Sequence, residues 1–143
     1  MQHGRRPHNL GYNTAMFEPS ILVTDDDDDF RETLKHVFLG MGFSVYTAAD
    51  GVEALEVFER ETIHIVTTDL HMPRLQGLAV LHVIHRAAPS VPCIIISGVV
   101  SEYSKRHAQY DRVVAIILKP ARLQTVRAAA SDAMWSAYQW KPN

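Results

Sequence analysis

Four short apolar runs of this chain each end at a side chain that can take part in chemistry. Carboxylates follow the first two runs, at Asp25, Asp26 and Asp69, while Ser97 and Lys119 follow the other two. Runs of this kind, separated by helix-like segments, predict the strands of a parallel sheet buried on both faces. The carboxyl ends of parallel strands meet at one edge, where open α/β sheets place their ligand sites. We therefore expect three carboxylates, a hydroxyl and an ammonium group to converge at that edge.

The elements that must position these residues alternate along the chain. Apolar runs rich in β-branched residues predict strands, and apolar residues recurring at helical spacing predict amphipathic helices between them. Such alternation predicts one parallel α/β sheet with right-handed crossovers and helices on both faces. The predicted strands cover 21–24, 43–48, 63–68, 93–96 and 113–118, and the helices that follow them begin near 29, 50, 77, 101 and 122.

Two capping-box patterns predict where helices begin. Asp29 is followed by Glu32, and Asp50 by Glu53, at the spacing where an acidic side chain caps a helix and a glutamate returns the hydrogen bond. Asp29 is therefore the expected cap of the first helix, and the aspartates at 27 and 28 are expected in a solvated loop.

The composition fits a single globular domain. Of 143 residues, 47% are apolar and 21% are charged, which argues against a disordered chain. A formal net charge of −2 gives no electrostatic reason to expect direct nucleic-acid binding. The single cysteine, Cys93, excludes a disulfide framework within the chain and favours a reducing, cytoplasmic setting. No apolar stretch approaches the roughly 20 residues that span a bilayer, so no membrane contact is expected.

The beginning of the chain does not share this pattern. It contains Arg5, Arg6 and Pro7 without strand or helix periodicity, and it lacks the continuous apolar centre of a secretory signal. We predict a flexible N-terminal extension over residues 1–19 and one folded domain over 20–140, with no output domain after the last helix. A tail that binds a partner is the alternative interpretation of the extension.

Two other metal sites are conceivable from residue spacing. Alternate aspartates of the run 25–29 stand at EF-hand spacing, but the sixth position of that loop is Phe30 rather than glycine and the twelfth is His36 rather than glutamate. His82 and His85 stand three positions apart on a predicted helix, with no carboxylate or cysteine near them in the sequence. We therefore expect no EF-hand, and we expect His82 and His85 to be surface histidines.

Six short motifs, in order and properly spaced, resemble the receiver domain of two-component response regulators over residues 20–139. Each motif is weak alone, and the combination is specific. The resemblance implies a flavodoxin-like (βα)5 sheet with strand order 2-1-3-4-5. The motifs are Ile21-Leu22-Val23-Thr24-Asp25-Asp26-Asp27, Asp50-Gly51-Val52-Glu53-Ala54-Leu55, Thr68-Asp69-Leu70-His71-Met72-Pro73, Gly77-Leu78, Ile94-Ile95-Ile96-Ser97-Gly98 and Leu118-Lys119-Pro120.

By this resemblance Asp69 is the phosphoacceptor, which takes a phosphoryl group from a phosphohistidine. The carboxylate forms an acyl phosphate as a nucleophile, and phosphoryl transfer requires mainly positioning and charge neutralisation. Asp25 and Asp26 match the acidic pair that binds a divalent cation together with Asp69, and the backbone carbonyl of His71 would supply another ligand. Oxygen ligands of this kind suit Mg²⁺ (or Mn²⁺).

Three carboxylates close enough to share one cation also repel one another. Two carboxylates repel by about 4 kcal/mol at 4 Å and an effective dielectric near 20. Without metal, at least one carboxyl group of this set is therefore expected to titrate abnormally.

The remaining site residues are also implied by the resemblance. Lys119 matches a lysine whose ammonium reaches the phosphoryl oxygens as a point charge, and the peptide bond to Pro120 is cis in the family. Ser97 matches the switch hydroxyl that turns toward the phosphoryl group. The aromatic residue that many receivers carry three positions before the lysine is replaced here by Ile116, which is stiff at χ1 and has no polar tip. A phenylalanine common in the family is replaced by Ala121.

Positions two beyond the phosphoacceptor and two beyond the switch hydroxyl tune dephosphorylation in the family, and they are His71 and Val99 here. The imidazole of His71 has two possible roles, orienting water or capping the site, and the sequence does not decide between them.

The implied function is a phosphorylation-driven signalling switch without a separate turnover substrate, hence not an enzyme in the usual sense. Its implied partners are a sensor histidine kinase or phosphotransfer protein and a downstream protein target. A homodimer through the predicted elements at 101–109, 113–118 and 122–139 is a further implied arrangement.

Two competing functions use the same residues. An aspartate-nucleophile hydrolase usually carries a second aspartate two positions after the nucleophile, where this chain has His71, and no cap domain is visible. A pseudo-receiver would be a protein-binding scaffold that is never phosphorylated. The complete set of Asp25, Asp26, Asp69 and Lys119 argues against a scaffold, whereas Ile116 keeps it as the alternative.

Overall fold

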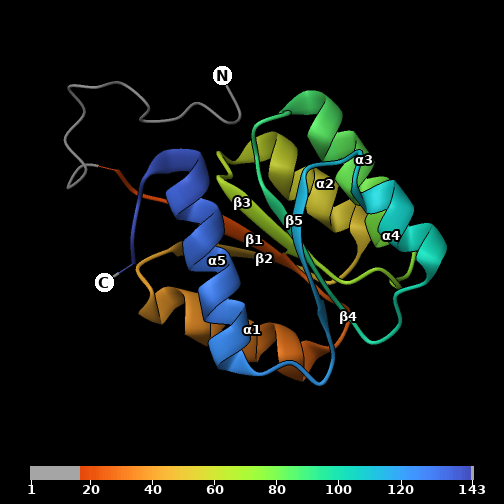
Figure 1. Cartoon of the computed structure of the whole chain (residues 1–143), viewed down its shortest axis with the longest axis horizontal. Helices are drawn as coiled ribbons and strands as arrows, with labels where there is room; N and C mark the ends of the chain where they lie inside the picture. Colours follow the sequence, from red (N-terminus) through yellow and green to blue (C-terminus); the bar gives the residue numbers. More distant parts are fainter. Residues whose placement is uncertain (1–16, 143) are drawn as a thin grey trace.

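The computed structural model describes residues 17–142 of the chain. Within this range five strands alternate with five helices, as the sequence predicts (Figure 1). The prediction of a flexible extension falls mostly on residues 1–16, outside the described residues. In chain order the elements are β1 (Ser20–Thr24), α1 (Asp28–Gly40), β2 (Ser44–Ala48), α2 (Gly51–Arg60), β3 (Ile65–Thr68), α3 (Gly77–Ala87), β4 (Cys93–Ser97), α4 (Glu102–Ala108), β5 (Val113–Leu118) and α5 (Leu123–Tyr138).

The strands form one parallel sheet in the order β2-β1-β3-β4-β5, which confirms the predicted fold. Helices α1 and α5 lie on one face of the sheet, and α2, α3 and α4 lie on the other (Figure 1). Among the residues described, no helix has the length and hydropathy needed to cross a bilayer.

Each face of the sheet builds its own apolar core, because successive side chains of a strand point to opposite faces. On β1, Leu22 packs toward α2 and α3, whereas its neighbours Ile21 and Val23 pack toward α1 and α5. The central strands are buried on both faces, and this explains why they read as continuous apolar runs in the sequence. The two cores hold the strand ends in fixed relative positions.

The first helix begins differently from the expectation. Asp27, not Asp29, is the N-cap: its backbone is extended, and its carboxylate accepts hydrogen bonds from the backbone N–H groups of Asp29 and Phe30 at 3.0 and 3.1 Å. The prediction of a solvated loop at 27 and 28 was therefore wrong, because α1 starts at Asp28. The second cap is confirmed, since Asp50 accepts from the N–H of Glu53 at 2.9 Å.

Beyond Val113, which packs against the core under α2 and α3, the edge strand β5 is covered on one face only. Helix α4 spans seven residues, and the side chains of Val114, Ile116 and Leu118, at alternate positions on β5, remain exposed. Ala115 and Ile117 point the other way, into the core under α5.

Candidate functional site

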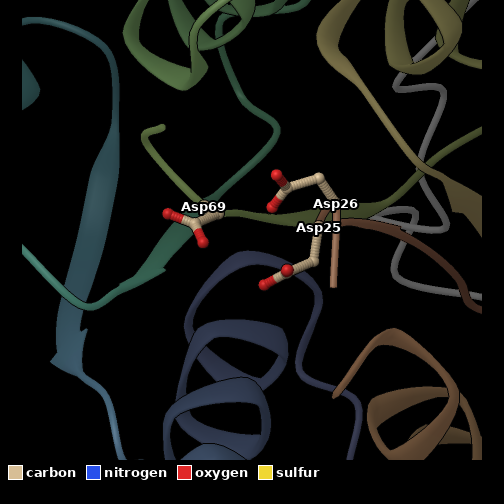
Figure 2. A group of neighbouring side chains, drawn as sticks. All are labelled: Asp25, Asp26 and Asp69. Atoms are coloured by element: carbon tan, nitrogen blue, oxygen red, sulfur yellow. The ribbon is translucent and has the colours of Figure 1, made fainter. Parts of the chain in front are cut away.

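Three carboxylates meet at the carboxyl edge of the sheet. Asp25 and Asp26 follow β1, and Asp69 follows the adjacent strand β3 (Figure 2). Asp25 and Asp69 are buried and Asp26 is exposed, yet one oxygen of each lies within 4.8 Å of the others. Among the described residues this is the only group of three or more potential metal-ligating side chains. The structure therefore brings together three carboxylates that the sequence placed at two strand ends.

Backbone hydrogen bonds of the neighbouring strands hold both buried aspartates. The N–H of Asp25 donates to the carbonyl of Ala48 at the end of β2, and the N–H of Asp69 donates to the carbonyl of Thr24, each at 3.1 Å. The Asp25 carboxylate also accepts from the N–H of Asp27 at 2.9 Å, which directs the chain into α1. The backbone hydrogen bonds of the sheet thus continue one residue beyond the strands and fix the positions of both carboxylates.

Lys119 connects the two buried carboxylates. Its Nζ lies 2.8 Å from Asp25 Oδ2 and 2.8 Å from Asp69 Oδ2. The peptide bond from Lys119 to Pro120 is cis, as the resemblance implies. The ammonium also lies 4.7 Å from the centre of the Phe30 ring on α1, at cation–π distance. Lys119 is thus held from three sides.

Ser97 reaches the other oxygen of the same aspartate. Its hydroxyl lies 2.7 Å from Asp69 Oδ1 and 3.3 Å from the backbone carbonyl of Val99. The residue is fully buried at the end of β4. The two oxygens of Asp69 therefore have separate donors, a hydroxyl on Oδ1 and an ammonium on Oδ2.

His71 contacts the site through its backbone, and its side chain bridges two loops. The N–H of His71 donates to Asp69 Oδ1 at 3.2 Å, while ring Nε2 lies 3.2 Å from the carbonyl of Val99 in the β4–α4 loop. Neither role considered for the imidazole included this contact. The metal-ligating role of the His71 carbonyl stays a prediction.

The titration of the buried groups follows from this geometry. Burial raises the pKa of Asp25, and the hydrogen bonds from Lys119 and the N–H of Asp27 oppose that rise without cancelling it. Burial alone would raise the pKa of Asp69 too, but hydrogen bonds from Lys119, Ser97 and the N–H of His71 outweigh it and hold that pKa below its usual value. The pKa of Lys119 is raised because its bonds to both carboxylates outweigh burial. The sequence-based expectation attributed abnormal titration to repulsion between carboxylates, whereas burial is the largest cause of the raised pKa of Asp25 and the charge of Asp69 is a smaller one.

The donor set fits a hard divalent cation. It consists of three carboxylates and no nitrogen or sulfur ligand, and Mg²⁺ and Mn²⁺ prefer oxygen donors. Three carboxylates against one ammonium leave the site with excess negative charge, which a divalent cation would offset.

The structure also shows where His82, His85 and Ile116 lie. His82 lies 3.3 Å from the carboxylate of Asp111, so it pairs with a residue distant in sequence, and His85 belongs to no group of three metal-ligating side chains among the described residues. Ile116 is 37% exposed on β5.

Two contributors to the site region escaped the sequence-based reasoning. Arg74 forms a bidentate ion pair with Asp50, and Gly77 lies so close to Asp69 that a Cβ at position 77 would be 2.1 Å from the Asp69 carbonyl oxygen. The Asp50–Arg74 pair spans 24 positions, beyond any local pattern. Gly77 belonged to a motif, but the reason for a glycine there becomes visible only in three dimensions.

Comparison with known proteins agrees with this geometry. The family described as "Response regulator receiver domain" matches residues 21–131. The transcriptional regulatory protein GlrR of Escherichia coli K12 is 30% identical over 114 residues, which is 80% of this chain and 26% of GlrR. This chain therefore spans about a quarter of the length of that curated relative.

Two solved structures show the same likeness. The receiver domain of NtrX from Brucella abortus has a TM-score of 0.74 and 28% identity, over 80% of this chain and 98% of that one. A CheY-like receiver domain protein from Methanospirillum hungatei has the same fold, with a TM-score of 0.82 and 22% identity over 85% and 97% of the two chains. The matched family, the shared fold and the site at the sheet edge lead to one conclusion: this chain belongs to the response regulator receiver domain family.

Proposed function

We propose that Asp69 accepts a phosphoryl group from a phosphohistidine on a sensor histidine kinase or a phosphotransfer protein. The observation that carries this proposal is the separate binding of the two Asp69 oxygens, by Ser97 at 2.7 Å and by Lys119 at 2.8 Å. A purely structural aspartate would need no ammonium, hydroxyl and acidic pair around it. The arrangement supports a carboxylate that is held in one orientation and prepared for nucleophilic attack.

In the proposed reaction one oxygen of Asp69 attacks phosphorus in line with the leaving imidazole. The new O–P bond forms as the P–N bond of phosphohistidine breaks, and the imidazole nitrogen leaves with the bonding electron pair. Lys119 lies where the oxygens of the transferred group would gather negative charge, and such charge stabilisation is the main requirement of phosphoryl transfer. The hydroxyl of Ser97 is free to exchange its carboxylate acceptor for a phosphoryl oxygen.

A Mg²⁺ or Mn²⁺ ion would be held by Asp25, Asp26, Asp69 and the backbone carbonyl of His71. When bound, the ion supplies charge neutralisation between the carboxylates and the incoming phosphoryl group. Asp25 and Asp69 would contribute from buried positions and Asp26 from the solvent side.

The proposed output is a change of a protein-binding surface. Phosphorylation adds a charge of about −1.5 to −2, and Ser97 would carry its effect into the β4–α4 loop. The exposed side chains of Val114, Ile116 and Leu118 support contacts through α4, β5 and α5, including a homodimer. We assign the domain to residues 20–140 and the setting to the cytoplasm, and we treat the protein as a signalling switch rather than an enzyme with a turnover substrate.

The test is exposure to acetyl phosphate with Mg²⁺, followed by intact-mass measurement, in the parent protein, Asp69→Asn and Asp28→Asn. The parent and the control Asp28→Asn, which changes an exposed aspartate of α1, are expected to gain one phosphoryl group, and Asp69→Asn is expected to gain none. Beryllofluoride with Mg²⁺ is expected to change the tryptophan fluorescence spectra of the parent and of Asp28→Asn, and to leave the spectrum of Asp69→Asn unchanged. An unchanged mass and unchanged spectra in the parent would refute the switch and favour the unphosphorylated scaffold.

A further inference from the structure

The loop between β3 and α3 contains a backbone conformation that its residue does not favour. Arg74 has φ of 67°, in the left-handed region where glycine is at ease and other residues are strained. Strained residues of this kind persist where the surroundings hold them, and they cluster at functional sites. A side chain at position 74 therefore needs an explanation, since glycine would relieve the strain.

The guanidinium of Arg74 supplies that explanation. Its Nε and Nη2 each donate to a different oxygen of Asp50 at 3.0 Å, a bidentate geometry that glycine or lysine would not reproduce. Asp50 is itself fixed, because it caps α2 by accepting from the N–H of Glu53 at 2.9 Å. Arg74 thus attaches the β3–α3 loop to the beginning of a helix.

A close backbone contact between the neighbouring residues, Gly51 and Leu75, reinforces this attachment. A Cβ at Gly51 would lie 2.2 Å from the carbonyl oxygen of Leu75, so the β3–α3 loop contacts the first residue of α2 directly. The distal part of the loop, at Arg74 and Leu75, is therefore held against α2 by an ion pair and by a close backbone contact.

The other end of the same loop carries the phosphoacceptor. His71 donates its N–H to Asp69 Oδ1 at 3.2 Å, and the N–H of Gly77 closes the loop onto the carbonyl of Leu70 at 2.9 Å. Between these two bonds the chain runs through Arg74. A shift of the loop would therefore move the backbone of His71 relative to Asp69.

We infer that Arg74 is a positioning residue: its ion pair with Asp50 holds the β3–α3 loop so that the backbone of His71 faces Asp69 and the proposed cation site. This inference rests on the proposed function and adds a residue to it. Arg74 acts through the loop rather than by touching the phosphoryl group.

The sign of one measurement separates positioning from simple electrostatics. Removing a positive charge close in sequence to an acidic site would strengthen Mg²⁺ binding if Arg74 acted by charge alone. If Arg74 positions the loop, its removal weakens Mg²⁺ binding although the charge of the protein becomes more negative.

The experiment compares the parent with Arg74→Gly, Arg74→Asn and the control Arg60→Asn. Glycine and asparagine both accept the left-handed backbone, so these variants remove the ion pair without adding strain. Arg60 pairs with Glu61 at the far end of α2, and its replacement makes the same change of charge. Mg²⁺ affinity is measured by calorimetry, hydrogen exchange of the His71 amide is measured without metal, and stability is measured by urea unfolding.

We expect both Arg74 variants to bind Mg²⁺ about tenfold more weakly, as when a residue that orients a metal ligand is lost. We also expect faster exchange of the His71 amide, with stability unchanged, and we expect the Arg60 control to resemble the parent. Equal or tighter Mg²⁺ binding, or unchanged amide exchange, in the Arg74 variants would overturn the inference. A parent that is not phosphorylated at all would refute the proposed function, whereas the exchange of the His71 amide still tests the role of Arg74.

Discussion

Replacing Lys119 by methionine is expected to destabilise the protein strongly and to make its stability depend on metal. Nζ lies 2.8 Å from a carboxylate oxygen of Asp25 and of Asp69, whose side chains are only 2% and 9% exposed. At 2.8 Å and an effective dielectric near 20, each pair attracts by about 6 kcal/mol before desolvation is counted. Removing one partner of a buried pair costs about 3–5 kcal/mol, because the remaining charge is left uncompensated. We expect a loss in this range for Lys119→Met at pH 7.

The dependence on pH has a definite sign. Asp69 has a lowered pKa in the parent, so its ionised form stabilises the fold above the unfolded pKa, and this stabilisation disappears as the pH falls through the folded pKa. The ionised Asp25, whose pKa is raised, already disfavours the fold in the parent, and without Lys119 the ionised Asp69 disfavours it too. The difference in stability between the parent and Lys119→Met is therefore expected to shrink as the pH falls below about 4.

The assay is urea unfolding followed by tryptophan fluorescence, since Trp140 packs against Phe43 and reports on the folded core. It is run in EDTA and in Mg²⁺, with Asp25→Asn/Lys119→Met as the second variant. We expect Mg²⁺ to recover part of the lost stability, and the second change to recover part of it without metal. If Lys119→Met loses less than about 1 kcal/mol in EDTA, the pairs behave like exposed ion pairs, and the reasoning about buried charge fails.

Three further predictions concern a thiol, a glycine and a hydroxyl. Burial raises the pKa of Cys93 to about 12, so the folded protein is expected to resist thiol reagents at neutral pH. As the pH rises from about 9 toward that value, the free energy of unfolding is expected to fall by about 1.4 kcal/mol per pH unit relative to Cys93→Ala. Urea unfolding measures this difference. Gly77→Ala places a Cβ 2.1 Å from the Asp69 carbonyl oxygen, whereas Gly98→Ala meets nothing within 4 Å, so we expect a loss of about 1–3 kcal/mol for the first and almost none for the second in thermal unfolding. Equal losses would contradict the packing argument. Ser97→Ala removes the hydroxyl donor of Asp69. We expect intact-mass measurements with acetyl phosphate to show about tenfold slower phosphorylation, the factor that corresponds to one hydrogen bond of about 1.4 kcal/mol. An unchanged rate would mean that this hydroxyl does not assist the transfer.

The position of the site could be predicted because it depends on topology rather than on side-chain detail. Parallel strands end at one edge, so Asp25, Asp69, Ser97 and Lys119 were expected together, and the structure places them together. What the sequence did not indicate is that Lys119 bridges two carboxylates. That contact depends on backbone positions that are 94 and 50 residues apart along the chain.

The first helix cap shows why local patterns can mislead. Five consecutive aspartates all have a side chain that suits an N-cap. The choice falls on Asp27 because Asp25 is bound to Ala48 in the ladder and accepts from the N–H of Asp27, which sets the point where the chain turns. The deciding contact is between strands, so no spacing within the run could reveal it. The ion pair between Arg74 and Asp50 was missed for the same reason.

The contact between His71 and Val99 has a consequence for how readily the loop after β4 can rearrange. The hydroxyl of Ser97 has one hydrogen, while two acceptors lie near it, Asp69 at 2.7 Å and the Val99 carbonyl at 3.3 Å. With a hydrogen on Nε2, the His71 ring, 3.2 Å from that carbonyl, is a second donor to it. Ser97 can therefore turn wholly toward Asp69 without leaving the Val99 carbonyl unbonded. A rearrangement that leaves no polar group unbonded avoids a major energetic penalty, which favours a rapid and reversible change of state.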